Sequence, residues 1–336
     1  FQAEDGIRDL VRSRGLGDVY KRQVVRAGGR HARAGKGKYV IAEACEAFGS
    51  FLHLNPVVVG VTNVDNDHMD YYKKMDALKE AFTNFINKIP FYGTAYLNGD
   101  DENIRSILPD IFVRYALFGF GAGCDIRASA VRKNGLSRSF NVMCRGVNLG
   151  RFEMPVPGRH NIMNALLAVA IGHDTGIRSS VIKKALLKFK NAKRRFEIYP
   201  GKKFTIVDDY GHHPVEVEKV LKTGKEICKK KVIVVFQPHL YSRTLQLYKE
   251  FAEALANADY VILDNIYPSR EAPVPGVTSG LIADAMRHNG YKNVYEEKDW
   301  PSIKDRVLSV AKKGDYVFLM GAGDIYRLRK EIEAGA

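Results

Sequence analysis

Two polar segments in the first half of the chain combine residue types that bind divalent metals. Glu43 follows a short apolar strand expected at Tyr39–Ala42, and His68 lies in the acidic stretch after a buried strand expected at Val57–Thr62. A carboxylate and a neutral imidazole beside nucleotide phosphates suit a divalent metal, because phosphate and carboxylate oxygens together supply a hard ligand set. A polar loop at a strand end is more often simply solvated, so both interpretations stay open for each segment.

Two asparagines open an apolar helix that we expect over Asn161–His173. Asn161 and Asn164 are three residues apart, a spacing that places side chains on one face of a helix. An N-cap would need only one of them. The second asparagine therefore indicates a hydrogen bond to a ligand, such as the edge of a purine.

A crowded loop between an expected strand and helix lies at 207–214. It holds Asp209, His212 and His213 together with a second acid and a tyrosine, far more polar groups than a turn requires. A metal site is one interpretation, although adjacent histidines usually point to different sides. In open parallel sheets, ligands bind beyond the carboxyl ends of the strands, so this loop is a candidate site.

Two more turns from strand to helix occur later in the chain. In the segment 236–244, Arg243 is well placed to hold an anion, because a guanidinium matches carboxylate and phosphate geometry. In the segment 320–325, Gly321 and Gly323 form a GxG turn. A lone GxG is a weak sign of nucleotide binding, and tight packing of a strand on a helix explains it equally well.

The elements that position these residues alternate between strand and helix and predict an α/β protein of two domains. Residues 1–23 show no clear period and are expected to be a non-native leader; the domains are expected over 24–191 and 192–336. From Phe196 onward, strict alternation predicts a mainly parallel, doubly wound sheet. The first domain is expected to end in an antiparallel meander. Its strands are expected at Ile126–Val131, Ser139–Cys144 and Gly150–Met154.

Composition narrows the classes of function. The 336 residues are 46% hydrophobic and 27% charged, which is ordinary for a globular protein and excludes a disordered or fibrous one. No apolar run is long enough for a membrane helix and no secretory signal is visible, so we expect a cytoplasmic protein without membrane insertion. The four cysteines are widely spaced, which excludes a zinc knuckle or a disulfide framework and fits a reducing compartment.

The net charge of +14 indicates anionic partners. No DNA-binding or RNA-binding motif accompanies the basic residues, so we expect no nucleic acid partner. The plain interpretation is a solvated basic surface. The sharper one is a site for small molecules that carry phosphate.

Nine segments, taken in order, resemble the Mur ligase family. They are IAEACE, SFLHLNP, TNVDNDHMDYY, PGRHNIMNALLAVA, KRRFE, VDDYGHHP, FQPHLYSRT, YPSREAPVPG and MGAGDI, and the resemblance extends from Val24 to about Glu333. Each segment is modest alone, but nine in this order are highly specific. The resemblance implies a central ATPase domain and a Rossmann-like C-terminal ligase domain. It also implies the branch that joins L-alanine to UDP-N-acetylmuramate with ATP and Mg²⁺.

The resemblance assigns roles to the candidates in the first domain. Glu43 and His68 match the family's metal ligands and are thereby catalytic candidates. Asn161 and Asn164 match asparagines near the adenine of ATP. Cys45 departs from the pattern, because the family usually has an aspartate there.

Further roles implied by the resemblance fall in the second domain. Arg195 and Asp209 match catalytic residues near the nucleotide that link the two domains. The residues matched to contacts with the muramoyl substrate are His212, His239 and Arg243. Leu240 stands where the family usually has an arginine, so the resemblance assigns no substrate contact to this position.

The chemistry implied by the resemblance is ATP-driven amide formation. The muramoyl carboxylate attacks the γ-phosphate to give an acyl phosphate, and the amine of L-alanine then displaces phosphate, while Mg²⁺ neutralises phosphate charge. The chain contains no GxxxxGKS/T phosphate loop and no counterpart of the family's uridine-binding first domain. We therefore expect this chain to be inactive by itself.

Two alternatives remain. Another Mur-type ligase, which recycles a murein tripeptide, shares several motifs, although DDYGHHP and EAPVPG favour the alanine-adding branch. Branches that add later residues usually carry a carbamylated lysine where this chain has Thr83, which argues against them. The second alternative is a non-catalytic anion-binding fragment, motivated by the net charge. The oligomeric state stays open.

Overall fold

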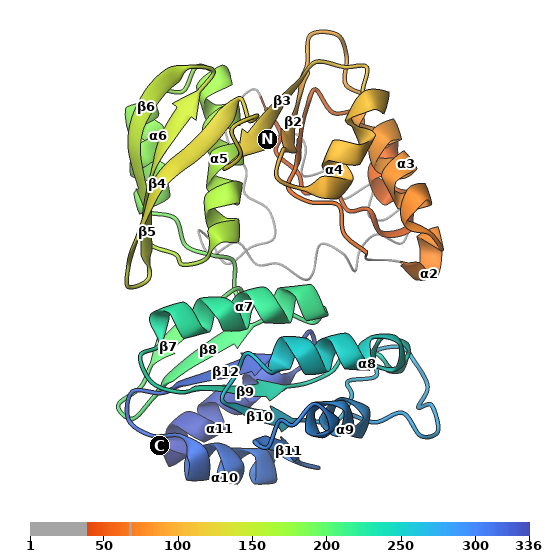
Figure 1. The fold of residues 1–336 in the computed structure, drawn as a ribbon, viewed down its shortest axis with the longest axis vertical. Coiled ribbons are helices and arrows are strands. Elements are labelled where there is room, and N and C mark those ends of the chain that lie inside the picture. Colours follow the sequence, from red (N-terminus) through yellow and green to blue (C-terminus); the bar gives the residue numbers. More distant parts are fainter. Residues whose placement is uncertain (1–38, 67–68) are drawn as a thin grey trace. The chain divides into compact units, whose positions relative to one another are not determined.

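The computed structural model describes residues 39–66 and 69–336, which divide into two compact units (Figure 1). The first unit ends at Lys190, and the second runs from Asn191 to Ala336. Each unit has its own six-stranded sheet and its own buried apolar core. Within the described ranges, no helix is long and apolar enough to cross a membrane.

The sheet of the first unit changes from parallel to antiparallel along its width. β1 to β4 pair in parallel, and β4 to β6 form an antiparallel meander, with the strands in chain order. The meander turns contain Gly135 and Gly146, whose φ angles of 54° and 82° favour glycine. The predicted meander is confirmed, with longer strands than expected. The strands are β1 (Val58–Val61), β2 (Thr94–Asn98), β3 (Tyr115–Gly119), β4 (Ile126–Asn134), β5 (Ser137–Cys144) and β6 (Val147–Met154).

The helices of the first unit enclose two separate groups of buried side chains. α3 and α4 contribute Leu78 and Ile104 to one group, and α5 contributes Leu166 to the other. Asp101 starts α4 as a typical N-cap, because its carboxylate accepts a hydrogen bond from the Ile104 N–H at 2.9 Å. The helices are η2 (Ala47–His53), α2 (Met69–Tyr72), α3 (Met75–Ile86), α4 (Glu102–Ile107), η3 (Leu108–Asp110), α5 (Arg159–Asp174) and α6 (Ser179–Leu187).

The strand predicted at Tyr39–Ala42 is wrong. Residues 39–46 have no regular structure, and the side chain of Ile41 is 90% exposed. An isolated extended segment is not stable as a strand unless its backbone pairs with a neighbour. Among the described residues, β1 forms its ladder with β2 alone, so Glu43 follows an irregular segment and not a strand.

The second unit has a mainly parallel sheet in the order β11-β10-β9-β12-β8-β7. Only the pair of β7 and β8 is antiparallel among these strands. All five residues of β9 are buried, as expected for a central strand that is covered on both faces. The strands are β7 (Glu197–Pro200), β8 (Thr205–Asp209), β9 (Val232–Phe236), β10 (Tyr260–Leu263), β11 (Val294–Glu296) and β12 (Tyr316–Met320).

Helices cover both faces of this second sheet (Figure 1). Val234 of β9 packs with α7, α8 and α9, whereas its neighbours Ile233 and Val235 pack with α10 and α11. Successive side chains of a strand point to opposite faces, so this division confirms the doubly wound fold. The helices are α7 (Pro214–Ile227), α8 (Tyr241–Leu255), α9 (Gly280–His288), α10 (Trp300–Val310), η4 (Ile325–Arg327) and α11 (Leu328–Gly335).

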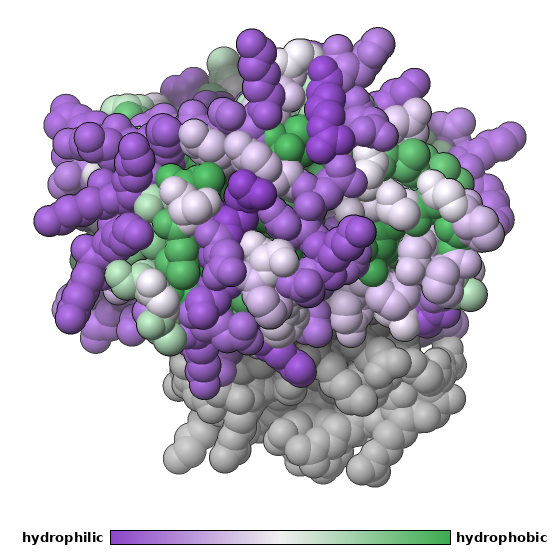
Figure 2. Space-filling view, turned by 90° about the horizontal axis from the view of Figure 1, so that it is seen from below, coloured by the Kyte–Doolittle hydropathy of each residue, from purple (hydrophilic) through white to green (hydrophobic). Residues whose placement is uncertain are grey.

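Hydrophilic side chains dominate the described face drawn in Figure 2, and apolar residues form small patches between them. Scattered apolar residues are normal on a protein surface. On this face, the hydrophilic residues are spread over the surface and not gathered in one patch.

Candidate active site

Four loops meet at one edge of the second sheet. β8, β12 and β9 are neighbours and run parallel, so their carboxyl ends share that edge. The loops that leave them start at Tyr210, Gly321 and Gln237. The loop after β10 joins them through a β-bridge between His239 and Tyr267. The fold thus gathers the candidate segments of the second domain at one place.

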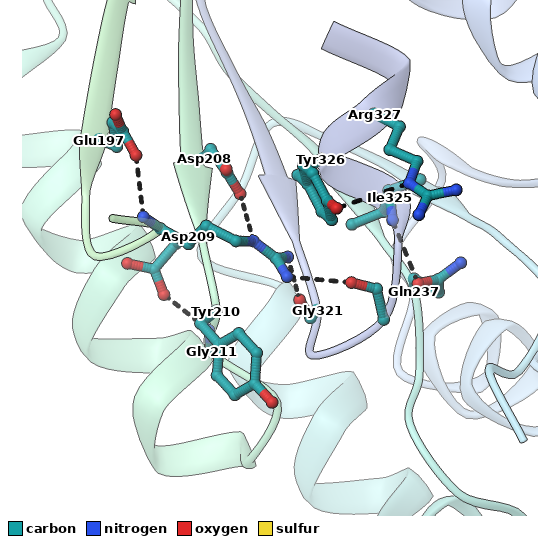
Figure 3. A network of polar contacts seen from close by, with 12 residues as sticks. Glu197, Asp208, Asp209, Tyr210, Gly211, Gln237, Gly321, Ile325, Tyr326 and Arg327 are labelled. Atoms are coloured by element: carbon teal, nitrogen blue, oxygen red, sulfur yellow. Dashed lines mark hydrogen bonds and ion pairs between the residues drawn. The ribbon is translucent and has the colours of Figure 1, made fainter. Parts of the chain in front are cut away.

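Arg194 organises this edge from the segment that enters the second unit. Its guanidinium donates to the Asp208 carboxylate at 3.2 Å and to the carbonyls of Gly321 and Gly323 at 2.5 and 2.9 Å. It also lies over the Tyr326 ring, 4.5 Å from the centroid. Figure 3 shows Asp208, Gly321 and Tyr326 converging here from β8, from the turn after β12 and from η4. One side chain therefore fastens the entering segment to two strand ends.

Sequence analysis missed Arg194, although it stands next to the predicted Arg195. Its backbone has φ of +58°, an unfavourable value for a residue with a Cβ, so its contacts must hold it there. Burial raises the pKa of Asp208 to about 6, and the charge of Arg194 opposes that rise. The KRRFE doublet was the signal, but nothing in the sequence tells which arginine is buried.

Asp209 is a buried organiser of the same edge. Its two carboxylate oxygens accept hydrogen bonds from the Phe196 N–H and the Gly211 N–H, both at 2.7 Å. Figure 3 shows the bond to Gly211. Burial raises the pKa of Asp209 to about 6, against the charge of Arg195 and the two N–H donors. Asp209 therefore joins the entering segment to the turn after β8.

Glu216, in the first turn of α7, is a second residue that sequence analysis missed. Its carboxylate accepts from the His212 N–H at 3.0 Å and lies 3.4 Å from both Arg195 Nη1 and His212 Nδ1. Burial would raise the pKa of Glu216, but the charges of His212 and Arg195 outweigh it and lower that pKa. Its position after Pro214 at the start of a helix, where acids are favoured, was an available signal.

A row of rings lies along this edge. Tyr210 and His212 meet edge to face with centroids 5.3 Å apart, and His212 meets His239 in the same way at 5.8 Å. His239 then stacks on Tyr267 with centroids 5.9 Å apart and ring planes 14° apart. The structure therefore brings the predicted residues His212 and His239 together. Tyr267 lies in the YPSREAPVPG segment but was not singled out.

The start of α8 is fixed by the loop after β10. Leu240 precedes the helix with φ of +72°, and its N–H donates to the Tyr267 carbonyl at 3.0 Å. The Ser242 N–H donates to the Glu271 carboxylate, also at 3.0 Å. The predicted residue Arg243 is half-buried in the first turn of this anchored helix.

The GxG turn after β12 is explained by close packing. A Cβ on Gly321 would lie 2.6 Å from the Gln237 carbonyl oxygen, and one on Gly323 would be closer still to the Gln237 side chain. The Gln237 amide donates to Asp264 at 2.8 Å and to Asp324 at 3.1 Å. Of the two interpretations of this turn, the geometry favours the tight packing of a strand on a helix.

The candidates of the first unit are not gathered in this way. Glu43 is exposed in the irregular segment, and His68 lies outside the described residues. Asn161 is buried and its amide donates to the Pro157 carbonyl at 2.6 Å, whereas Asn164 is exposed. Gly158 is the residue before α5, so neither asparagine is its N-cap. Asn161 is thus accounted for by the fold, and Asn164 is the asparagine that the solvent reaches.

The metal interpretation of the loop at 207–214 gains no support from this geometry. Both oxygens of Asp209 are engaged by backbone N–H groups, and His212 faces Glu216. Within the described residues, the ligand atoms of Asp209, His212 and His213 are not gathered closely enough to hold a metal ion together.

Two family models match the chain in consecutive stretches. The Mur ligase middle domain matches residues 30–172, and the glutamate ligase domain of the Mur ligases matches residues 194–323.

Curated relatives match along most of the chain. The UDP-N-acetylmuramate–L-alanine ligase of Geotalea uraniireducens is 40% identical over 301 residues, which are 89% of this chain and 66% of the relative. The enzyme of the same name from Anaeromyxobacter dehalogenans is 40% identical over 314 residues, 92% of this chain and 68% of the relative. The chain therefore spans about two thirds of the length of the curated relatives it matches.

Solved structures share the fold of this chain. The UDP-N-acetylmuramate-alanine ligase of Thermotoga maritima superposes with a TM-score of 0.69 at 24% identity, covering 85% of this chain and 61% of that one. A murein peptide ligase of Psychrobacter arcticus superposes with a TM-score of 0.59 at 19% identity, covering 85% and 58%. At such identities the likeness concerns the fold alone, and it confirms the predicted fold class.

Proposed function

The chain belongs to the Mur ligase family, and we propose that it serves the ATP-dependent joining of L-alanine to UDP-N-acetylmuramate in peptidoglycan precursor synthesis. The observation that carries the proposal is the identity of about 40% to relatives named for that reaction, maintained over about 90% of the chain. The structure supports it with an edge of the second sheet where two of the predicted substrate residues, His212 and His239, are in ring contact.

That edge suits an anionic donor. Arg195, His212, His239 and Arg243 place donor groups and positive charge beside the strand ends, and Glu216 keeps Arg195 and His212 oriented. A substrate that carries a carboxylate and a diphosphate is attracted to such groups. We propose that His212, His239 and Arg243 bind and orient the muramoyl donor, and that Arg195 beside them contacts the nucleotide.

We propose residues of the first unit for the adenine of ATP and for the metal. ATP supplies the phosphate that activates the carboxylate, and Mg²⁺ screens its charge. Glu43 offers an oxygen ligand of the kind that Mg²⁺ prefers, and we propose that Glu43 and His68 hold the metal. We propose Asn164 as the asparagine that contacts adenine, because Asn161 already bonds within its own helix turn.

Asp209 takes a positioning role in this proposal. Its carboxylate accepts hydrogen bonds from the backbone N–H groups of Phe196 and Gly211. These bonds fix the segment that carries Arg195. Asp209 thereby sets where the Arg195 guanidinium lies, and it need not touch the nucleotide.

A chimera tests the function. The chimera joins the N-terminal third of the Geotalea uraniireducens relative to this chain at Val24. We expect release of phosphate from ATP that requires UDP-N-acetylmuramate and L-alanine together, with much slower turnover for glutamate or a murein tripeptide. Preference for the tripeptide would assign the chain to the recycling branch. His239→Ala in the chimera should raise the KM for the muramoyl donor more than it lowers kcat.

A further inference from the structure

Three side chains with metal-binding atoms meet at the far end of α5, away from every residue assigned above. Cys144 is the last residue of β5, and His173 and Asp174 are the last two residues of α5. Their sulfur, nitrogen and oxygen atoms all lie within 4.8 Å of one another. Cys144 Sγ is 3.9 Å from His173 Nδ1, which is 3.3 Å from Asp174 Oδ1.

These separations approach those of a zinc site. Zn²⁺ binds sulfur at about 2.3 Å and nitrogen or oxygen at about 2.0–2.2 Å in a tetrahedron, so its ligand atoms stand roughly 3.3–3.6 Å apart. The pair of His173 and Asp174 already has this spacing, and Cys144 needs to approach His173 by only a few tenths of an ångström, while its Sγ lies within 4.8 Å of an Asp174 oxygen. We propose that Cys144, His173 and Asp174 bind Zn²⁺, with water as the fourth ligand.

The donor set selects the metal. A thiolate with an imidazole favours Zn²⁺ over Mg²⁺, which prefers oxygen ligands. Sequence analysis did not predict this set, because all of β6 and most of α5 separate Cys144 from the other two residues. The site is also distinct from the nucleotide residues, since Asn161 lies about 18 Å from His173 along the axis of α5.

The surroundings of Asp174 hold its carboxylate in place. Arg145 donates to its two oxygens at 3.1 and 3.0 Å, and the Tyr96 hydroxyl donates at 2.5 Å. Such outer hydrogen bonds orient the ligands of metal sites. The charge of Arg145 opposes a cation, but the thiolate of Cys144 and the carboxylate of Asp174 together balance the two charges of Zn²⁺.

The site is open enough for an ion to enter. The side chains of His173 and Asp174 are 37% and 21% exposed, whereas Cys144 is buried at 2%. The thiol thus forms the inner wall and the other two ligands form the rim. A bound ion would fasten the end of β5 to the end of the helix that begins with Asn161 and Asn164.

The test is a titration of the metal-free, reduced 336-residue chain with Co²⁺, a coloured substitute for Zn²⁺. We expect the ultraviolet charge-transfer absorption of a cobalt thiolate to saturate at one ion per chain and to disappear when Zn²⁺ is added. Cys144→Ser should abolish the absorption. Cys228→Ser is the matched control, because that thiol is also buried but faces the carbonyls of Lys231 and Gly314. The control should keep the absorption unchanged.

A second variant covers the case in which Cys144→Ser fails to fold. His173→Gln alters a partly exposed side chain and should weaken Co²⁺ binding at least tenfold while the circular dichroism stays the same. Zn²⁺ should raise the melting temperature of the unchanged chain but not that of His173→Gln. Absence of a thiolate absorption, or its survival in Cys144→Ser, would overturn the proposal and leave the cluster as an ion-pair network around Asp174.

Discussion

The strand ends of the second unit and the candidate residues of the first unit are held in opposite ways. In the second unit, Arg194, Asp209 and Gln237 are tied to backbone groups of neighbouring loops (Figure 3). In the first unit, Glu43 and Asn164 are exposed and stand apart in the sequence. The candidate residues of the second unit are therefore held in a hydrogen-bonded framework, whereas those of the first unit are separate, exposed side chains.

This difference distinguishes buried residues that hold the loops of the site in place from exposed residues that a ligand can contact. A buried charge is tolerated only with partners, so Asp208 and Asp209 reveal the framework of the edge by their hydrogen bonds. The side chains on the outside of that framework, such as Arg195 and His239, are the ones that we propose as ligand-binding residues. The comparison therefore predicts large stability effects within the framework and small ones outside it.

The largest effect is expected for Arg194→Ala. The substitution leaves Asp208 buried without its cation and removes the donors to two carbonyls, so we expect a loss of about 3–5 kcal/mol in the unfolding free energy of the second unit. The chain's single tryptophan, Trp300, lies in that unit, and its fluorescence during urea unfolding reports on it alone.

The neighbouring arginine is the matched control. Arg195 pairs with Glu216, and both side chains are more than a third exposed, so Arg195→Ala should cost less than about 1 kcal/mol. Similar losses for the two arginines would contradict the division between framework and ligand-facing residues.

The next effect concerns pH. Burial raises the pKa of Asp209 to about 6 from its ordinary value of 3.8, so folding favours the protonated form. Its contribution to stability is full below about pH 4 and is lost as the pH rises through about 6, on the order of 3 kcal/mol. Asp209→Asn should remove the part of the pH dependence that comes from Asp209. The part that comes from Asp208 should stay, because burial raises the pKa of Asp208 in the same way.

The measurement compares unfolding free energies from Trp300 fluorescence between about pH 4.5 and 7. We expect the fall in stability over this range to shrink by about half in Asp209→Asn. Asp299→Asn is the control, because hydrogen bonds to Ser302 lower the pKa of Asp299 and place its effect below this range. An unchanged slope in Asp209→Asn would show that this carboxylate is ionised in the folded chain throughout.

Sequence patterns predicted the second sheet well because its strands are short apolar runs separated by amphipathic helices. The wrong strand at Tyr39–Ala42 shows the limit: an apolar run becomes a strand only where a partner backbone is present. Local patterns also pointed to Asp209 and His212 but missed Arg194. Which arginine of a doublet turns inward depends on the carbonyls of Gly321 and Gly323, which lie far away in the sequence.

The smallest effects are expected from the two asparagines of α5, and they test the comparison inside the first unit. Asn161→Ala removes a buried hydrogen bond to the Pro157 carbonyl, so it should destabilise the first unit by about 1 kcal/mol. Asn164→Ala alters an exposed side chain and should leave stability within about 0.5 kcal/mol. Hydrogen exchange of the α5 amides measures both values without interference from the second unit. In the chimera, Asn164→Ala should raise the KM for ATP, because adenine loses its proposed contact. A change in KM for Asn161→Ala alone would move the adenine contact to the buried asparagine and show that α5 rearranges when the nucleotide binds.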